Sequence, residues 1–154
     1  PVICSSETKQ RFRERLVLFH CSGVRSARDI LNNQKQNVAR NIRDWDKMVE
    51  LAQDFRSVLL KNQDIDRIGD ILHESWMLKR TMGDKITTSA IDDWYGKARK
   101  AGAAGGKLLG AGGGGFLLFF VEPDRQGAVC EELADLRRIP FEFEPQGSKI
   151  IYLS

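Results

Sequence analysis

A run of glycines between two apolar segments is the part of this chain whose residue types best suit chemistry. Residues Lys107–Leu118 read KLLGAGGGGFLL, with four consecutive glycines after Gly110 and Ala111. Ordering a glycine costs more conformational entropy than ordering any other residue, so the run implies a compensating gain. One gain is a tight connection between two strands that needs positive φ angles. The other is a surface of unobstructed backbone N–H groups that an anion such as phosphate can approach. Both interpretations stay open at this point, and they can hold together.

Other kinds of catalytic site find little support in the sequence. His20 and His73 are the only histidines, and neither belongs to an arrangement typical of hydrolysis. The three cysteines, Cys4, Cys21 and Cys130, show no metal-ligand spacing. The glycine run lacks the Gly-Lys-Ser/Thr ending of a Walker A loop, and a strand-like segment follows it where a dinucleotide-binding fold needs a helix. The residues alone therefore indicate a glycine-rich loop between strands that can approach an anion.

The strands that must position this loop are predicted from apolar segments. Leu16–Cys21 and Phe116–Val121 are continuous apolar runs of strand length, so both strands are expected to be buried. The alternating residues Ile139–Glu144 predict a half-buried strand, which a turn at Pro145–Ser148 joins to a final strand at Lys149–Leu153. The chain is therefore expected to end in a hairpin.

The helices are predicted from spacing and from capping residues. Apolar residues recur at intervals of three and four over Ile42–Leu60, which predicts one long amphipathic helix. A second helix is expected to begin at an Asp64 N-cap and to stop at Gly83, and Thr87 or Thr88 is expected to cap a third. Shorter helices are predicted at residues 6–15, at residues 27–38 behind a Ser26 cap, and from Pro123 to about Leu136.

Grouped helices with a short sheet indicate an α+β fold: an antiparallel sheet of about four strands with helices packed on one face. A length of 154 residues suits a single domain, 1–154, with a real core. Cys21 is expected to be a small core residue. The arginines of the first predicted helix are expected to form a solvated face; they are Arg11, Arg13 and Arg15.

Composition narrows the class of protein. The net charge is +3, and basic residues are mixed with acidic ones, so no nucleic-acid partner is expected. The sequence has no apolar run of roughly 18 to 20 residues and no signal-peptide pattern, so no membrane association is expected. Three widely spaced cysteines are typical of reduced thiols, which favours a cytoplasmic location.

Four segments resemble the C-terminal domain of the GHMP kinases, the family of galactokinase, homoserine kinase, mevalonate kinase and phosphomevalonate kinase. Gly106–Phe116 is similar to the third, C-terminal motif of that family. LVLFHCSGVRSARDIL at Leu16–Leu31 and HESWMLKR at His73–Arg80 resemble the opening strand and helix and the middle helix of its sugar-kinase branch. FEFEPQGSKIIY at Phe141–Tyr152 is similar to the closing hairpin, especially in D-glycero-D-manno-heptose phosphate kinases, with L-fucokinases next.

The resemblance implies a ferredoxin-like domain of an ATP-dependent kinase that transfers the γ-phosphate to a heptose phosphate or related sugar. The third motif of the family lies beside the nucleotide phosphate loop, which implies cofactor binding by Gly110, Ala111, Gly112, Gly113, Gly114 and Gly115. Lys107 is a candidate substrate-binding residue, with a solvated edge-strand lysine as the alternative. For Trp76, Lys79 and Arg80 the alternatives are sugar contacts or a packed helix with a solvated flank.

The second motif of the family, the PxxxGLGSS loop that cradles the ATP phosphates, has no counterpart in this sequence. The same holds for the N-terminal half, which carries the catalytic acid and the magnesium ligand. The chain starts at Pro1, so we expect a fragment of a longer enzyme, catalytically silent alone, with ATP and Mg as cofactors of the full-length protein and none bound to the fragment. Its expected partners are the missing N-terminal kinase domain, the sugar or sugar phosphate, and a second copy of the chain in a homodimer. The alternative is a stand-alone ligand-binding or oligomerisation module of the same fold.

Overall fold

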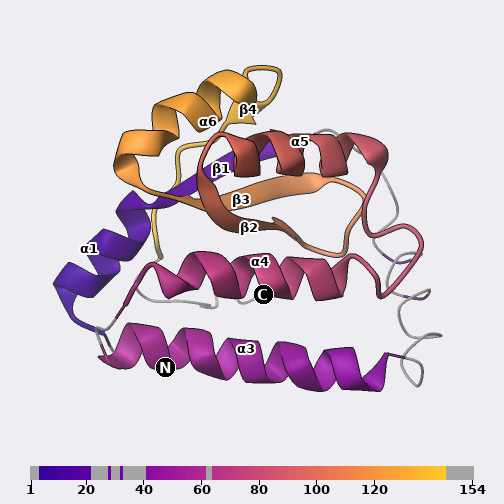
Figure 1. The fold of residues 1–154 in the computed structure, drawn as a ribbon, viewed down its shortest axis with the longest axis horizontal. Coiled ribbons are helices and arrows are strands. Elements are labelled where there is room, and N and C mark those ends of the chain that lie inside the picture. Colours follow the sequence, from indigo (N-terminus) through magenta and orange to yellow (C-terminus); the bar gives the residue numbers. More distant parts are fainter. Residues whose placement is uncertain (1–3, 22–27, 29–31, 33–40, 62–63, 145–154) are drawn as a thin grey trace, which may run out of the picture.

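The computed structural model describes residues 4–21, 28, 32, 41–61 and 64–144. At its centre lies a four-stranded sheet in the order β2-β3-β1-β4, in which every neighbouring pair is antiparallel. The strands are β1 (Leu16–Cys21), β2 (Ala103–Leu109), β3 (Gly115–Val121) and β4 (Arg137–Arg138). The helices are α1 (Ser6–Glu14), α3 (Ile42–Lys61), α4 (Arg67–Lys79), α5 (Ser89–Lys100), η1 (Pro123–Arg125) and α6 (Gln126–Glu132) (Figure 1).

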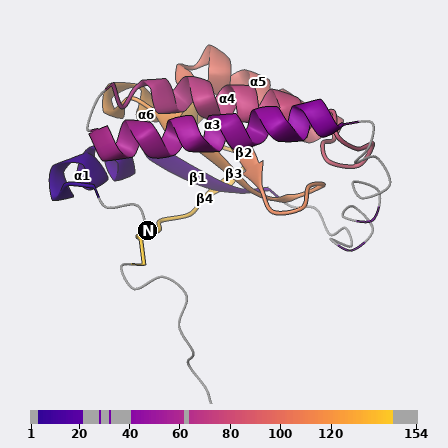
Figure 2. The same cartoon turned by 90° about the horizontal axis from the view of Figure 1, so that it is seen from below.

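The helices α3 to α6 lie on one side of the strands (Figure 2). Among them, α4 runs beside β2, an edge strand of the sheet, and α3 packs on the outer side of α4 (Figure 1). The predicted α+β fold, with an antiparallel sheet of four strands and helices on one face, is therefore confirmed. This arrangement places the end of α4 close to the β2–β3 connection, where the glycine run lies.

The main core forms between alternate residues of the central strands and the helices. Phe19 of β1 and Phe119 of β3 are both 1% exposed or less, and their rings meet edge to face at 6.2 Å. Trp76 of α4 and Tyr95 of α5 pack against the same cluster. Cys21 is fully buried there, as predicted. Burying such large side chains is the dominant favourable term in folding, so the sheet and helices form one packed unit at this face.

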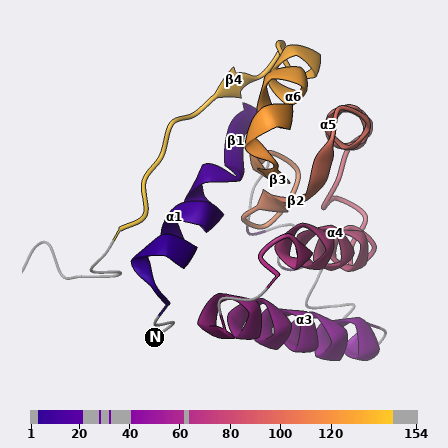
Figure 3. The same ribbon diagram turned by 60° about the vertical axis from the view of Figure 1, so that its left-hand side comes forward.

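A second aromatic cluster ties α1 to the rest of the structure. The Phe12 ring stacks on Phe143 at 5.6 Å and on Phe120 at 6.4 Å, and it meets Phe55 of α3 edge to face at 5.6 Å. In Figure 3, α1 and the segment after β4 lie on the opposite side of the sheet from α5. The cluster therefore covers, together with residues of α3 and α4, part of the sheet face opposite α5.

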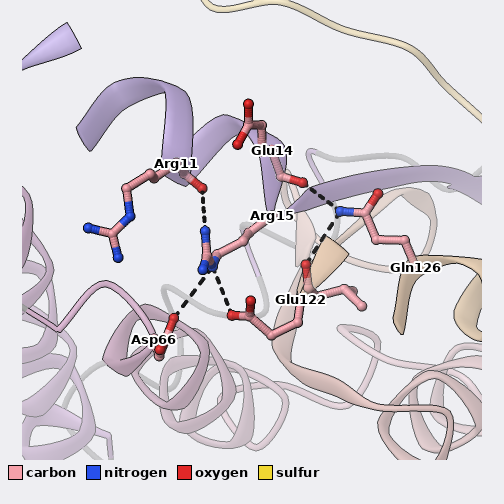
Figure 4. A network of polar contacts seen from close by, with 7 residues as sticks. Arg11, Glu14, Arg15, Asp66, Glu122 and Gln126 are labelled. Carbon is pink, nitrogen blue, oxygen red and sulfur yellow. Dashed lines mark hydrogen bonds and ion pairs between the residues drawn. The ribbon is translucent and has the colours of Figure 1, made fainter. Parts of the chain in front are cut away.

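Arg15 corrects the prediction of a solvated arginine face on α1. Its side chain is 15% exposed, and its Nε donates to Glu122 at 2.8 Å and lies 3.4 Å from Asp66 (Figure 4). Beside it, Gln126 donates through Nε2 to the Glu14 carbonyl at 2.5 Å. The helical pattern could not reveal these partners because they come from distant parts of the chain. The network joins α1 to the segments that follow β3 and precede α4.

Helix boundaries were predicted with mixed success. Thr88 caps α5 as expected, accepting a 3.2 Å hydrogen bond from the Ile91 N–H. The Asp64 N-cap is wrong, because Asp64 has a φ of 41° and α4 begins only at Arg67. The stop at Gly83 is also wrong, since α4 ends at Lys79. The helix predicted from Pro123 to about Leu136 is shorter, with a 3-10 turn first and α6 ending at Glu132.

The predicted strand Ile139–Glu144 is wrong. Among the described residues, sheet pairing stops after β4, whose two arginines pair with Phe19 and His20. Beyond β4, the Ile139 N–H still reaches the Leu18 carbonyl, at 2.8 Å. Pro140 follows and has no N–H to continue the ladder. The predicted turn at 145–148 and strand at 149–153 lie outside the described residues. Of the helix predicted at 27–38, only Arg28 and Asn32 are described, both helical.

Candidate phosphate-binding loop

The glycine run forms the connection between β2 and β3, and its backbone needs glycine. The φ angles of Gly110, Gly112, Gly113, Gly114 and Gly115 are 87°, 129°, 73°, 151° and 114°. Side-chain-bearing L-residues rarely adopt such angles. The interpretation as a tight connection with positive φ is therefore confirmed.

One side of the loop is held against the connection between α4 and α5. The Gly113 N–H donates to the Ile86 carbonyl at 2.8 Å, and Ile86 is fully buried. A Cβ built on Gly112 would lie 2.7 Å from the Ile86 Cα, so only glycine allows this approach. At Gly110, by contrast, a Cβ would meet nothing within 4 Å. The loop thus has one fixed side and one open side, which fits a backbone surface that a phosphate can approach.

Two lysines lie beside the loop. Lys79 is the last residue of α4, and its Nζ donates to the Gly110 carbonyl at 2.5 Å. Lys107 of β2 donates through Nζ to the Ser75 hydroxyl at 3.2 Å. Because Ser75 and Lys79 are four residues apart on α4, their side chains share one face of that helix. The structure therefore brings Ser75, Lys79 and Lys107 together next to the loop.

The surroundings of both lysines disfavour their charge. Burial, and then the nearby Lys107 ammonium, lower the pKa of Lys79 to about 8. Burial also lowers the pKa of Lys107. Among the described residues, no carboxylate lies within ion-pair distance of either ammonium group. The site holds two half-buried positive charges without an acidic counterion from that part of the chain.

The other candidate residues of this region have structural roles. Trp76 is fully buried, which supports a packed helix over a sugar contact. Arg80 pairs with Asp92 at 2.7 Å, and Thr87 donates to the same carboxylate at 2.7 Å. Lys79 is the residue that sequence reasoning undervalued as a solvated flank. Its position four residues after Ser75, at the end of a helix, was the only available signal.

Neither a metal site nor a membrane-spanning helix is found among the described residues. They contain no group of three or more His, Cys, Asp or Glu side chains placed to hold a metal ion. No helix among them combines the length and apolar character needed to cross a bilayer.

We expect the variant Lys79→Met to unfold at higher urea concentration than the wild type at pH 7. The folded-state pKa of Lys79, about 8, is below its unfolded value near 10.5. The charged lysine therefore lowers the free energy of unfolding, and this penalty has its full size below pH 8. That penalty disappears as the pH rises from about 8 to above 10.5. After discounting for solvent and for the lost bond to Gly110, the gain should be about 1 kcal/mol. Urea unfolding at pH 7 and pH 10 measures it. An advantage that is equal at both pH values, or absent at pH 7, would contradict this account.

Comparison with known proteins places the loop in a family context. The model of the family described as GHMP kinases C terminal matches residues 48–137, which is more than half of the chain and includes the whole glycine loop. The chain belongs to this family. The resemblance read from the glycine motif and from His73–Arg80 is thereby confirmed.

Two curated proteins are similar to this GHMP kinase C-terminal domain. A D-glycero-alpha-D-manno-heptose 7-phosphate kinase of Campylobacter jejuni is 30% identical over 114 residues, which cover 73% of this chain and 33% of that protein. A bifunctional fucokinase/GDP-fucose pyrophosphorylase of Arabidopsis thaliana is 28% identical over 128 residues, which cover 79% of this chain and 12% of that protein. The domain therefore spans a third or less of the length of these curated relatives.

A solved structure shows that the fold is shared more widely. The L. major mevalonate kinase, crystallised with R-mevalonate, superposes with a TM-score of 0.68 at 17% identity. The match covers 90% of this chain and 43% of the mevalonate kinase chain. At this identity the likeness shows the fold of the GHMP kinase C-terminal domain and nothing finer.

Proposed function

We propose that this domain is the C-terminal part of an ATP-dependent sugar kinase that transfers the γ-phosphate to a heptose phosphate or a related sugar. The heptose 7-phosphate kinase and fucokinase relatives support a sugar acceptor. The observation that carries the proposal is the loop Gly110–Gly115, whose positive φ angles and bond to Ile86 hold bare backbone beside two lysines. Such a surface suits one wall of a phosphate pocket.

The residues of this chain would act by position and charge. When bound, ATP supplies the phosphoryl group and Mg neutralises part of its charge. The backbone of Gly110–Gly115, including Ala111, would approach the phosphates closely, because no large side chain separates its N–H groups from the phosphate oxygens. Lys79 and Lys107 would place positive charge where negative charge gathers during transfer. Phosphoryl transfer depends mostly on such positioning and electrostatic stabilisation.

The remainder of the enzyme belongs to the proposal as well. The curated relatives are much longer than this chain, which supports an N-terminal kinase domain as its partner. That domain would supply the second phosphate loop, the catalytic acid and the magnesium ligand. The isolated 154 residues would then be inactive and would not hold ATP tightly. We place the enzyme in the cytoplasm, since its substrates are ATP and a sugar phosphate.

An ADP-release assay tests the proposal. The protein encoded by the full reading frame around Pro1, and the 154-residue chain alone, would each be given ATP, Mg and a panel of heptose 7-phosphate, heptose, fucose and mevalonate. We expect turnover with a sugar or sugar phosphate by the longer protein and none by the chain alone. Turnover by the isolated chain would refute its proposed dependence on a second domain. A longer protein without sugar-dependent turnover would refute the kinase assignment.

A further inference from the structure

We propose that Lys79 and Lys107, together with the Ser75 hydroxyl and the open side of the glycine loop, form a binding subsite for a terminal phosphate dianion. The subsite deepens the proposed function, because it identifies which charged side chains of this domain would recognise phosphate. Lys79 comes from α4 and Lys107 from β2, so two separate elements converge on one place. Their hydrogen bonds to the Gly110 carbonyl and to Ser75 fix both ammonium groups there.

The charge balance at this place indicates an anion. Two other half-buried cations of the described chain have an acidic partner: Arg15 pairs with Glu122 and Arg80 with Asp92. Lys79 and Lys107 have no such partner within the described residues, and they repel each other. Two like charges without a counterion are costly unless a ligand neutralises them. A bound dianion would remove the repulsion.

The shape of the surroundings indicates from which side the anion approaches. Ser75 and Lys107 also form the polar end of a cleft of about 290 Å³ between α3 and α4. The rest of that cleft is apolar, lined by Met48, Leu51, Ala52, Phe55, Ile71 and Leu72. Such walls offer no partners to the hydroxyl groups of a sugar or to a charged phosphate. The polar approach to the lysine pair is therefore from the glycine loop, where Gly110 faces open space.

Phosphate suits this donor set better than a neutral group. Two ammonium groups and a hydroxyl provide several hydrogen-bond donors, and each charged donor strengthens the bond to an ionised acceptor. Two sources could supply the dianion: the phosphate that the acceptor sugar already carries, or the terminal phosphate of the nucleotide. Both have the same chemistry at the subsite, so the experiment must separate them.

Calorimetric titration of the 154-residue chain tests the subsite without requiring catalysis. The probes are heptose 7-phosphate, unphosphorylated heptose and ADP, given to the wild type and to Lys79→Met, Lys107→Met and Lys100→Gln. Lys100 is an exposed lysine of α5 and serves as the matched control, because its loss changes the net charge equally. Thermal unfolding of each variant confirms that it is folded.

We expect at least one phosphate-bearing probe to bind, with heptose much weaker than heptose 7-phosphate if the sugar supplies the dianion. Each methionine variant should lose about 10- to 100-fold in affinity for that probe, while Lys100→Gln changes it little. If only the affinity for ADP falls in the lysine variants, the subsite binds the phosphate of the nucleotide. Three outcomes would overturn the proposal. One is equal affinity for heptose and heptose 7-phosphate, combined with ADP binding that does not depend on the lysines. The others are unchanged affinity in the methionine variants and no binding of any phosphate-bearing probe.

The result is separable from that of the kinase assay. The 154-residue chain could bind phosphate through the lysines while the longer protein shows no phosphoryl transfer. That result would support the subsite and refute the kinase assignment. A working kinase whose activity and affinity are unaffected by Lys79→Met and Lys107→Met would refute the subsite alone.

Discussion

Gly105→Ala should destabilise the domain by about 3 kcal/mol, because it forces the backbones of α4 and β2 apart. A Cβ on Gly105 would overlap the Gly69 carbonyl oxygen and lie 2.7 Å from the Gly69 carbonyl carbon and 3.0 Å from the His73 nitrogen. These are backbone atoms of a helix, which cannot rotate out of the way as a side chain can. Relief would require α4 to move away from the sheet.

Urea unfolding followed by tryptophan fluorescence measures this effect, since Trp76 is fully buried in the affected core. The control is Gly96→Ala in the interior of α5, where a Cβ would meet nothing within 4 Å. That change should raise stability by roughly 0.5 to 1 kcal/mol through helix propensity. If both variants shifted the unfolding midpoint in the same direction, close packing of α4 on β2 would not be the cause.

Gly112→Ala should reduce the turnover of the proposed full-length kinase by about 100-fold, since small displacements of positioning groups have effects of that size. Gly112 has a φ of 129°, and its new Cβ would lie 2.7 Å from the Ile86 Cα and 2.9 Å from the Ile86 oxygen. The contact would push the loop off its support and break the bond from the Gly113 N–H to Ile86.

The matched control is Gly110→Ala, which also sits at positive φ but in open space. It adds backbone strain of about 1 kcal/mol without a collision with Ile86, so it should change amide exchange at Gly113 much less than Gly112→Ala does. In the 154-residue chain, amide hydrogen exchange at Gly113 provides a second measurement: Gly112→Ala should accelerate it strongly. Equal acceleration of Gly113 exchange in the two variants would show that the contact with Ile86 does not set the loop position.

Much of the frame around the loop could be predicted from local patterns. The apolar runs at Leu16–Cys21 and Phe116–Val121 became β1 and β3, and the spacing over Ile42–Leu60 became α3. These elements follow from which residues avoid water, and that information is local. The glycine run could be placed between strands for the same reason.

The remaining features depend on partners that are remote in the sequence. The sequence does not reveal the contact of Lys79, because the acceptor, the Gly110 carbonyl, belongs to a different element. The helical pattern predicts a solvated Arg15, because its partners Glu122 and Asp66 lie far along the chain. Ile139–Glu144 alternates apolar and polar residues, but the segment does not pair as a strand. Pro140 lacks an N–H for the sheet, and Phe143 packs on Phe12 instead. Helix and strand patterns record exposure to water, whereas contacts between elements follow from topology.

The strand order β2-β3-β1-β4 also has a consequence for how the chain reaches this structure. The hairpin of β2 and β3 joins neighbours in sequence, whereas β1 must pair Leu16 with Phe120 across most of the chain. Closing so large a loop loses chain entropy before the pairing contributes any stability, and non-local contacts of this kind slow folding. We therefore expect the α4, β2 and β3 region to become ordered first, and the insertion of β1 between β3 and β4 to limit the folding rate.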